Sequence, residues 1–144
     1  MTQKEKELLL KDICARLPYG LKVKCEKYSF PVTILYGGNI DEVKFKETGG
    51  IENICTIKPY LFPLSSMTEE QLHELKDITA FRYNRNTLEL VKWAETHKTL
   101  EFWLEEVPQY EVVEVFDWLN KNHFDYRCLI EKGLAIDATG LNIY

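Results

Sequence analysis

The sequence predicts an α+β protein with an N-terminal helix, a small antiparallel sheet and a mainly helical C-terminal half. Three patterns support this fold class. Apolar residues recur at helical spacing over residues 3–17, they alternate with charged residues from residue 21 onward, and they return to helical spacing over residues 112–119. A change of period from 3.6 to 2 and back to 3.6 is typical of segregated helices and strands.

The first element is a helix over residues 3–17. Leu9, Ile13 and Leu17 fall on one side at fourfold spacing, and Lys, Glu and Asp residues occupy the other side. The sequence Pro18-Tyr19-Gly20 ends it. This helix therefore has one face to bury against the sheet that follows.

Four short strands are expected next. In the first, Leu21, Val23 and Cys25 alternate with charged residues, which is the pattern of a strand with one wet face. Turn residues then separate the other three, which we expect at residues 31–36, 43–46 and 51–57. They predict a four-stranded antiparallel sheet or a small, partly open barrel whose edges are covered by helices.

The segment 58–64 contains two prolines, which favour an extended strap because proline restricts its predecessor and lacks an N–H. Thr68 and Gln71 then form the sequence of a capping box, so a helix starts there. Its expected inner stripe comprises Leu72, Leu75, Ile78 and Thr79.

Residues 84–107 fit two templates. Helical steps of three and four link Leu90, Trp93, His97 and Leu100, whereas a polar turn at residues 95–98 also permits a hairpin. We favour the helix and leave the hairpin open.

The last third predicts a helix carrying Val112, Val115, Phe116 and Leu119. We expect Asp125 to cap a short helix over residues 126–132, and Gly133-Leu134 to stop it as a Schellman motif. Residues 135–137 are compatible with an edge strand, and we expect residues 139–144 to fray.

Length and charge limit the organisation and the class of partner. We expect one domain over residues 1–144, with a helix-plus-sheet lobe at 1–64 and a mainly helical lobe at 65–144. The net charge is −5, divided into +2 for residues 1–68 and −7 for residues 69–144. This balance disfavours a dedicated nucleic-acid binder, which is usually basic.

We expect a cytoplasmic protein with free thiols and no cofactor. The N-terminal apolar run is too short for an export signal, and no stretch is long enough for a membrane span. The four cysteines and three histidines lack the spacing of a zinc site, so no metal is expected. Two Gly-Gly pairs match hairpin turns and not phosphate-binding loops.

The segment 117–128 carries the densest chemistry. Cys128 and His123 supply the residue types of a nucleophilic pair, although a structural role in the core and at a helix junction explains them more simply. A third interpretation is an aromatic interaction surface, because Trp, Tyr and Arg are enriched in interface hot spots. Its candidate residues are Trp118, His123, Phe124, Tyr126 and Arg127.

The outer face of the predicted sheet is rich in lysine and offers an alternative site. A nucleic-acid or nucleotide-binding face is the functional interpretation, and protection of the sheet against aggregation is the structural one. The candidate residues are Lys22, Lys24, Lys44, Lys46 and Tyr36.

Two blocks carry a resemblance to a known family. KPYLFPLSSMTEE at residues 58–70, and DWLN followed by HFDYR and LIEKGLA within residues 117–135, resemble a family of small uncharacterised proteins from gut anaerobic bacteria and their phages. The resemblance implies a phage or prophage setting and an accessory or host-interaction role. That family often carries glycine where this chain has Cys128, which weighs against a catalytic thiol.

Together these patterns favour a small accessory protein that acts by non-catalytic contact with another protein, through the region from Trp118 to Arg127. Nucleic-acid or nucleotide binding through the lysine-rich sheet is the alternative, and a cryptic enzyme using Cys128 and His123 comes third. The partner's identity and the oligomeric state lie beyond the sequence.

Overall fold

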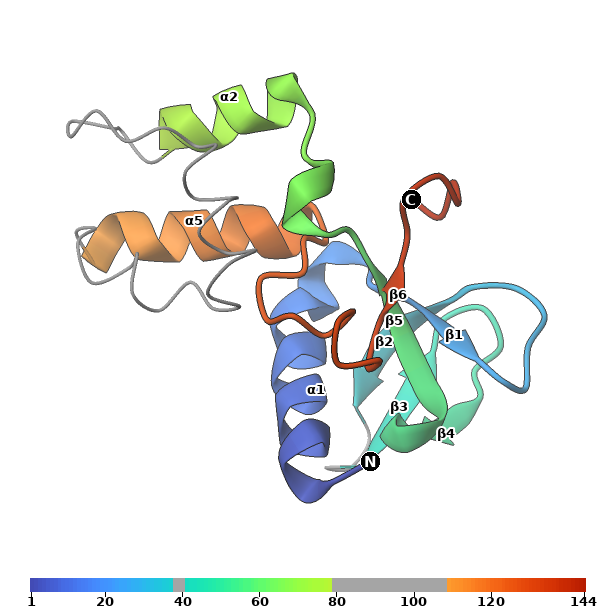
Figure 1. Cartoon of the computed structure of the whole chain (residues 1–144). Coiled ribbons are helices and arrows are strands. Elements are labelled where there is room, and N and C mark those ends of the chain that lie inside the picture. The colour runs from blue at the N-terminus through green and yellow to red at the C-terminus, as the bar shows by residue number, and fades with distance from the viewer. Residues whose placement is uncertain (38–40, 79–108) are drawn as a thin grey trace. The chain divides into compact units, whose positions relative to one another are not determined.

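The computed structural model describes residues 1–37, 41–78 and 109–144, which form two compact units (Figure 1). The sheet unit comprises Met1–Leu61 and Leu129–Tyr144, and the helical unit comprises Phe62–Cys128. Residues 129–144, which the sequence assigned to the helical lobe, thus belong to the sheet unit. Residues 84–107, with their two alternative templates, lie outside the described residues.

Helix α1 (Gln3–Arg16) confirms the first predicted element. Its start is a capping box, in which Thr2 Oγ1 accepts from Glu5 N–H and the Glu5 carboxylate accepts from Thr2 N–H. Near its end, Arg16 Nε and Nη2 donate to the Asp12 carboxylate at 2.8 and 3.0 Å, and both side chains are fully buried. Gly20, with φ +68°, then turns the chain toward the sheet.

The described residues form a six-stranded mixed open sheet in the order β4-β3-β2-β1-β5-β6. All neighbouring strands pair antiparallel except β5 and β6, which are parallel. The strands are β1 (Lys22–Cys25), β2 (Val32–Gly37), β3 (Glu42–Phe45), β4 (Ile51–Asn53), β5 (Ile57–Leu61) and β6 (Ile136–Asp137).

The expected four-stranded sheet or partly open barrel is therefore wrong. The missing element is β5, which the sequence analysis divided between a fourth strand and a proline strap. Ile57, Pro59 and Leu61 are buried on one face while Lys58 is exposed on the other, so this segment alternates like any strand. The C-terminal edge strand that the sequence allowed is confirmed as β6.

Pro59 fits into this strand because of its register. Ile34 N–H donates to the carbonyl of Leu21, so Leu21 and Val23 direct their backbone polar groups toward β2. Pro59 lies opposite Val23, at a position where the β1–β5 ladder has no hydrogen bond from a backbone N–H of β5 to β1. The proline therefore removes no hydrogen bond from the β1–β5 ladder.

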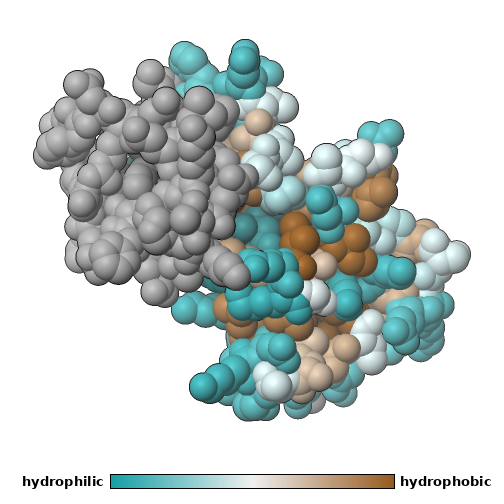
Figure 2. Space-filling model, in the orientation of Figure 1, coloured by the Kyte–Doolittle hydropathy of each residue, from teal (hydrophilic) through white to brown (hydrophobic). Residues whose placement is uncertain are grey.

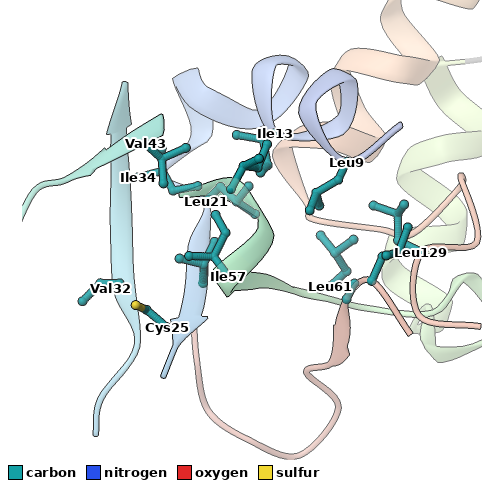
Figure 3. Close-up of a cluster of buried hydrophobic side chains, with 14 of the residues drawn as sticks. Leu9, Ile13, Leu21, Cys25, Val32, Ile34, Val43, Ile57, Leu61 and Leu129 are labelled. Atoms are coloured by element: carbon teal, nitrogen blue, oxygen red, sulfur yellow. The ribbon is translucent and has the colours of Figure 1, made fainter. Parts of the chain in front are cut away.

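Helix α1 and the inward residues of the strands form the core of the sheet unit (Figure 3). Leu9 and Ile13 point from α1 toward the sheet, where Leu21, Ile34 and Ile57 meet them. Leu129, from the returning C-terminal segment, lies close to Leu61 in the same cluster. Burying one face of β1, β2, β3 and β5 in this way leaves their alternate residues on the opposite, outer face.

The helical unit contains α2 (Glu69–Ile78) and α5 (Gln109–Lys121), which lie side by side (Figure 1). Thr68 and Gln71 make the predicted capping box at the start of α2. Leu75, from the expected inner stripe, is fully buried. The periodicity therefore predicted correctly that Leu75 of α2 faces the core of the helical unit.

The expected short helix over residues 126–132 is wrong, since this segment is a series of turns. The Schellman motif at its end is nevertheless confirmed. Gly133, with φ +70°, donates to the Ile130 carbonyl, and Leu134 donates to the Leu129 carbonyl. Asp125 is buried in the helical unit, where its N–H donates to the Phe62 carbonyl.

We predict an acid-sensitive contribution from Glu47, whose carboxylate accepts from Thr33 N–H at 2.8 Å and from Thr33 Oγ1 at 2.6 Å. Burial alone would raise the pKa of Glu47, but these bonds outweigh it and hold the pKa below 4.5. The bonded carboxylate stabilises the fold above that ordinary value, and this stabilisation is lost as pH falls through the lowered pKa. Glu47→Gln should cost about 0.5–1 kcal/mol near neutral pH, and this cost should shrink as the pH is lowered and the carboxylate takes up a proton. Urea midpoints at neutral pH and at acidic pH check this, and an equal cost at both would contradict it.

Candidate binding surfaces

The residues of the predicted aromatic site do come together, around the end of α5 in the helical unit. Trp118 and Phe124 stack with ring centroids 5.5 Å apart and planes inclined by 14°. Phe62 lies against Phe124, and its backbone holds this segment, because Phe62 N–H donates to the His123 carbonyl at 2.9 Å. The aromatic residues that the sequence singled out therefore share one cluster.

Polar contacts fix the rim of this cluster. Trp118 Nε1 donates to the Glu74 carboxylate of α2 at 3.1 Å. The Tyr126 hydroxyl donates to Asn120 Oδ1 at 2.9 Å in a buried position, and the Arg127 guanidinium lies 4.5 Å from the centre of the Tyr126 ring. Buried Trp and Tyr side chains require such partners for their polar atoms.

Most side chains of the predicted aromatic site are buried. Trp118, His123, Phe124 and Tyr126 are all buried, and only Arg127 is half-buried. Trp118, Phe124 and Tyr126 belong to the hydrophobic core of the helical unit together with Leu75, Val115 and Leu119. An interaction role for this region stays a prediction, and a partner would reach Arg127 before it reached the rings.

His123 terminates α5 through a second Schellman motif. His123 adopts φ +59°, its N–H donates to the Asn120 carbonyl at 3.1 Å, and Phe124 N–H donates to the Leu119 carbonyl at 2.9 Å. The apolar contact that accompanies this motif is present, since Leu119 and Phe124 are both in the core. The position of His123 thus follows from the end of the helix.

Cys128 also has a left-handed backbone, with φ +57°. Glycine is the residue that adopts this conformation most readily. A nucleophilic role for Cys128 with His123 stays a prediction. Among the described residues, no group of three or more His, Cys, Asp or Glu side chains is arranged to hold a metal ion.

The lysine-rich candidate site lies on the outer face of the sheet. Lys22 pairs with Thr33 across β1 and β2, and Lys46 N–H donates to the Thr33 carbonyl, so two lysines flank Thr33 in one row. Lys44 lies on β3 opposite Tyr36, whose side chain is outside the described residues. The structure thus brings the four predicted lysines to one face.

One further lysine, missed by the sequence analysis, completes this face. Lys58 of β5 lies directly opposite Lys24 of β1, and both side chains are exposed. Neither has an ion-pair partner in the described ranges. The alternation of residues 57–61 was the signal that would have found Lys58, but the prolines obscured it.

Apolar side chains accompany the lysines. Leu35 and Ile51 are each about half exposed, at 49% and 54%, and Ile51 lies opposite Lys44. Figure 2 shows the sheet unit with small hydrophobic patches between hydrophilic residues. We call the set Lys22, Lys24, Lys44, Lys46, Lys58, Leu35 and Ile51 the lysine face.

The two units differ in charge. The sheet unit has 11 basic and 10 acidic residues, a net charge of +1, whereas the helical unit has 7 and 13, a net charge of −6. The lysine face therefore sits on the less acidic part of the chain. An anionic partner would approach it with the least repulsion.

A scan against protein-family models, a search of the curated proteins and a search of the solved structures each returned no match to this chain. In the described part of the chain, no helix has the length and apolar character needed to cross a bilayer.

The left-handed backbone at His123 leads to a comparison of two variants. His123→Ala and His123→Gly both remove the imidazole, but only glycine accepts φ +59° without strain. We predict that the alanine variant is less stable than the glycine variant by about 1 kcal/mol. Urea unfolding of the two proteins measures this difference, and equal stabilities would contradict the assigned Schellman motif.

Proposed function

We propose that this protein acts by non-catalytic binding of another protein, and that its contact surface is the lysine face. The observation that carries the proposal is the pair Lys24 and Lys58. Like charges directly opposite each other across two strands destabilise a sheet, and no acidic neighbour in the described ranges relieves this pair. An acidic partner would relieve it.

Protection of a sheet edge explains these lysines less well than a binding role does. Lys22 and Lys24 belong to β1, which has β2 on one side and β5 on the other. A charge on an interior strand does not block addition of a further strand. The lysines of β1 therefore favour a binding role over an edge-protecting one.

The exposed apolar residues favour a protein as the partner. Leu35 and Ile51 lie among the lysines, and a mixture of apolar area with a charged rim is typical of protein interfaces. An acidic protein surface would meet the ammonium groups while covering these side chains. A cytosolic accessory role in a phage or prophage setting, implied by the resemblance, belongs to this proposal.

Nucleic acid is the second candidate. Lys46 and Lys22 flank Thr33 of β2, so this row places cationic side chains on both sides of a strand whose neighbours lie about 4.8 Å away. Such a row suits a phosphate backbone. Its binding would fall steeply with salt whatever the base sequence.

Charge reversal tests the proposal with a matched control. We predict that a poly-L-glutamate peptide of about 20 residues binds the wild type, and that Lys24→Glu with Lys58→Glu weakens binding at least about tenfold because two contacts become repulsive. The control, Lys4→Glu with Lys11→Glu, changes the same charge at exposed positions of α1 and should alter affinity by less than about twofold.

Fluorescence anisotropy at two salt concentrations measures these affinities, and a single-stranded oligothymidylate of about 15 nucleotides serves as the second probe. Binding of the oligonucleotide without binding of the peptide would transfer the function to the second candidate. Equal losses in the two double variants, or no binding of either probe, would overturn the proposal.

A further inference from the structure

The last residues of the sheet unit close the β1–β5 ladder with a side chain. The Tyr144 hydroxyl accepts from Lys22 N–H at 3.2 Å and donates to the Tyr60 carbonyl at 2.8 Å. Lys22 and Tyr60 are the next hydrogen-bonding positions after Lys24 and Lys58. The hydroxyl therefore takes the place of a direct bond between the strands.

Tyr144 is 45% exposed, but partial burial of its hydroxyl raises the pKa of this group well above the ordinary value, although the hydrogen bond from Lys22 N–H and the nearby Arg16 lower it. Tyr144 is therefore protonated near neutral pH, as its donation to the Tyr60 carbonyl requires. The bridge consists of a neutral group that needs no counter-ion.

The same segment occupies the ammonium group of Lys22. Lys22 Nζ donates to the Ile143 carbonyl at 2.5 Å and lies 5.8 Å from the centre of the Tyr144 ring. A carbonyl and an aromatic ring satisfy the donors of an ammonium group but leave its charge in place. An incoming carboxylate would bind Lys22 more strongly than this segment does, because a hydrogen bond between two ionised groups is stronger.

Between its anchors the segment makes few contacts. Ala138 N–H donates to the Leu61 carbonyl at its start, and the contacts of Ile143 and Tyr144 hold its end. Thr139, Gly140, Leu141 and Asn142 are exposed. The hydrogen bonds from Thr139 N–H to the Asp137 carboxylate and from Leu141 N–H to the Ala138 carbonyl are local. Releasing the end would therefore leave β6 and its pairing with β5 in place.

We propose that residues 139–144 form a displaceable clasp that occupies the ammonium group of Lys22 within the lysine face until an acidic segment of a partner protein displaces the clasp. This inference rests on the proposed function, and it adds a regulatory contact to the same surface. Displacement gives the partner a third lysine next to Lys24 and Lys58. The clasp thus lowers the affinity of the free protein for weakly acidic surfaces.

A double-mutant cycle between Lys22 and Tyr144 tests the clasp, with the poly-L-glutamate peptide as the probe. Tyr144→Ala should bind the peptide about three- to tenfold more tightly than the wild type, since the clasp no longer competes. Lys22→Ala should cost less than about twofold in the wild type, where Lys22 is occupied, and about five- to tenfold in the Tyr144→Ala background. Leu141→Ala, an exposed change within the same segment, is the control and should leave the affinity unchanged.

Circular dichroism checks that each variant is folded. If Tyr144→Ala does not fold, Tyr144→Phe removes only the bridging hydroxyl and should shift affinity in the same direction by a smaller factor.

Three results separate the two claims. If Lys22→Ala costs the same in both backgrounds, while reversal of Lys24 and Lys58 still weakens binding, the clasp is wrong and the proposed function stands. If no variant binds the peptide, both are overturned. If the cycle shows the stated coupling, the clasp is supported.

Discussion

Helix α1 packs against one face of the sheet, and this one-sided burial determines most of what the sheet unit presents to its surroundings. Leu9 and Ile13 can cover only the inward residues, so β1, β3 and β5 alternate buried with more exposed side chains. A shift of one residue in β1 would exchange Val23 with Lys24 and bury a charge without a partner. The register that buries the core therefore also places the lysines together on the outer face.

In the helical unit, an aromatic cluster forms around the end of α5. Its α5 ends in a Schellman motif at His123, and the residue after it, Phe124, returns to stack on Trp118. The Phe62 backbone then fixes the segment on both sides of Phe124. The aromatic residues that the sequence offered as an interaction surface are therefore buried in this core. The outer face of the sheet is for this reason the better candidate for recognition.

The sequence predicted what depends on local periodicity and failed where long-range pairing decides. The capping boxes at Thr2 and Thr68 lie within one helical turn of their partners, so the start of α2 was predictable from spacing alone. Strand β5 was not, because two prolines suggested a strap and only the register opposite Val23 shows why Pro59 is tolerated. Likewise, Tyr144 was expected to fray, since no local pattern reveals that its hydroxyl meets Lys22, 122 residues away in the chain.

The central claim is that the outer face of the sheet, and not the aromatic segment of the helical unit, meets the partner. An NMR titration of the full chain with the poly-L-glutamate peptide tests this claim most directly, because backbone amide shifts report each residue separately. The account predicts that shifts concentrate on Lys22, Lys24, Lys58 and Tyr144. Shifts confined to residues 118–127, with the amides of β1 and β5 unchanged, would contradict it.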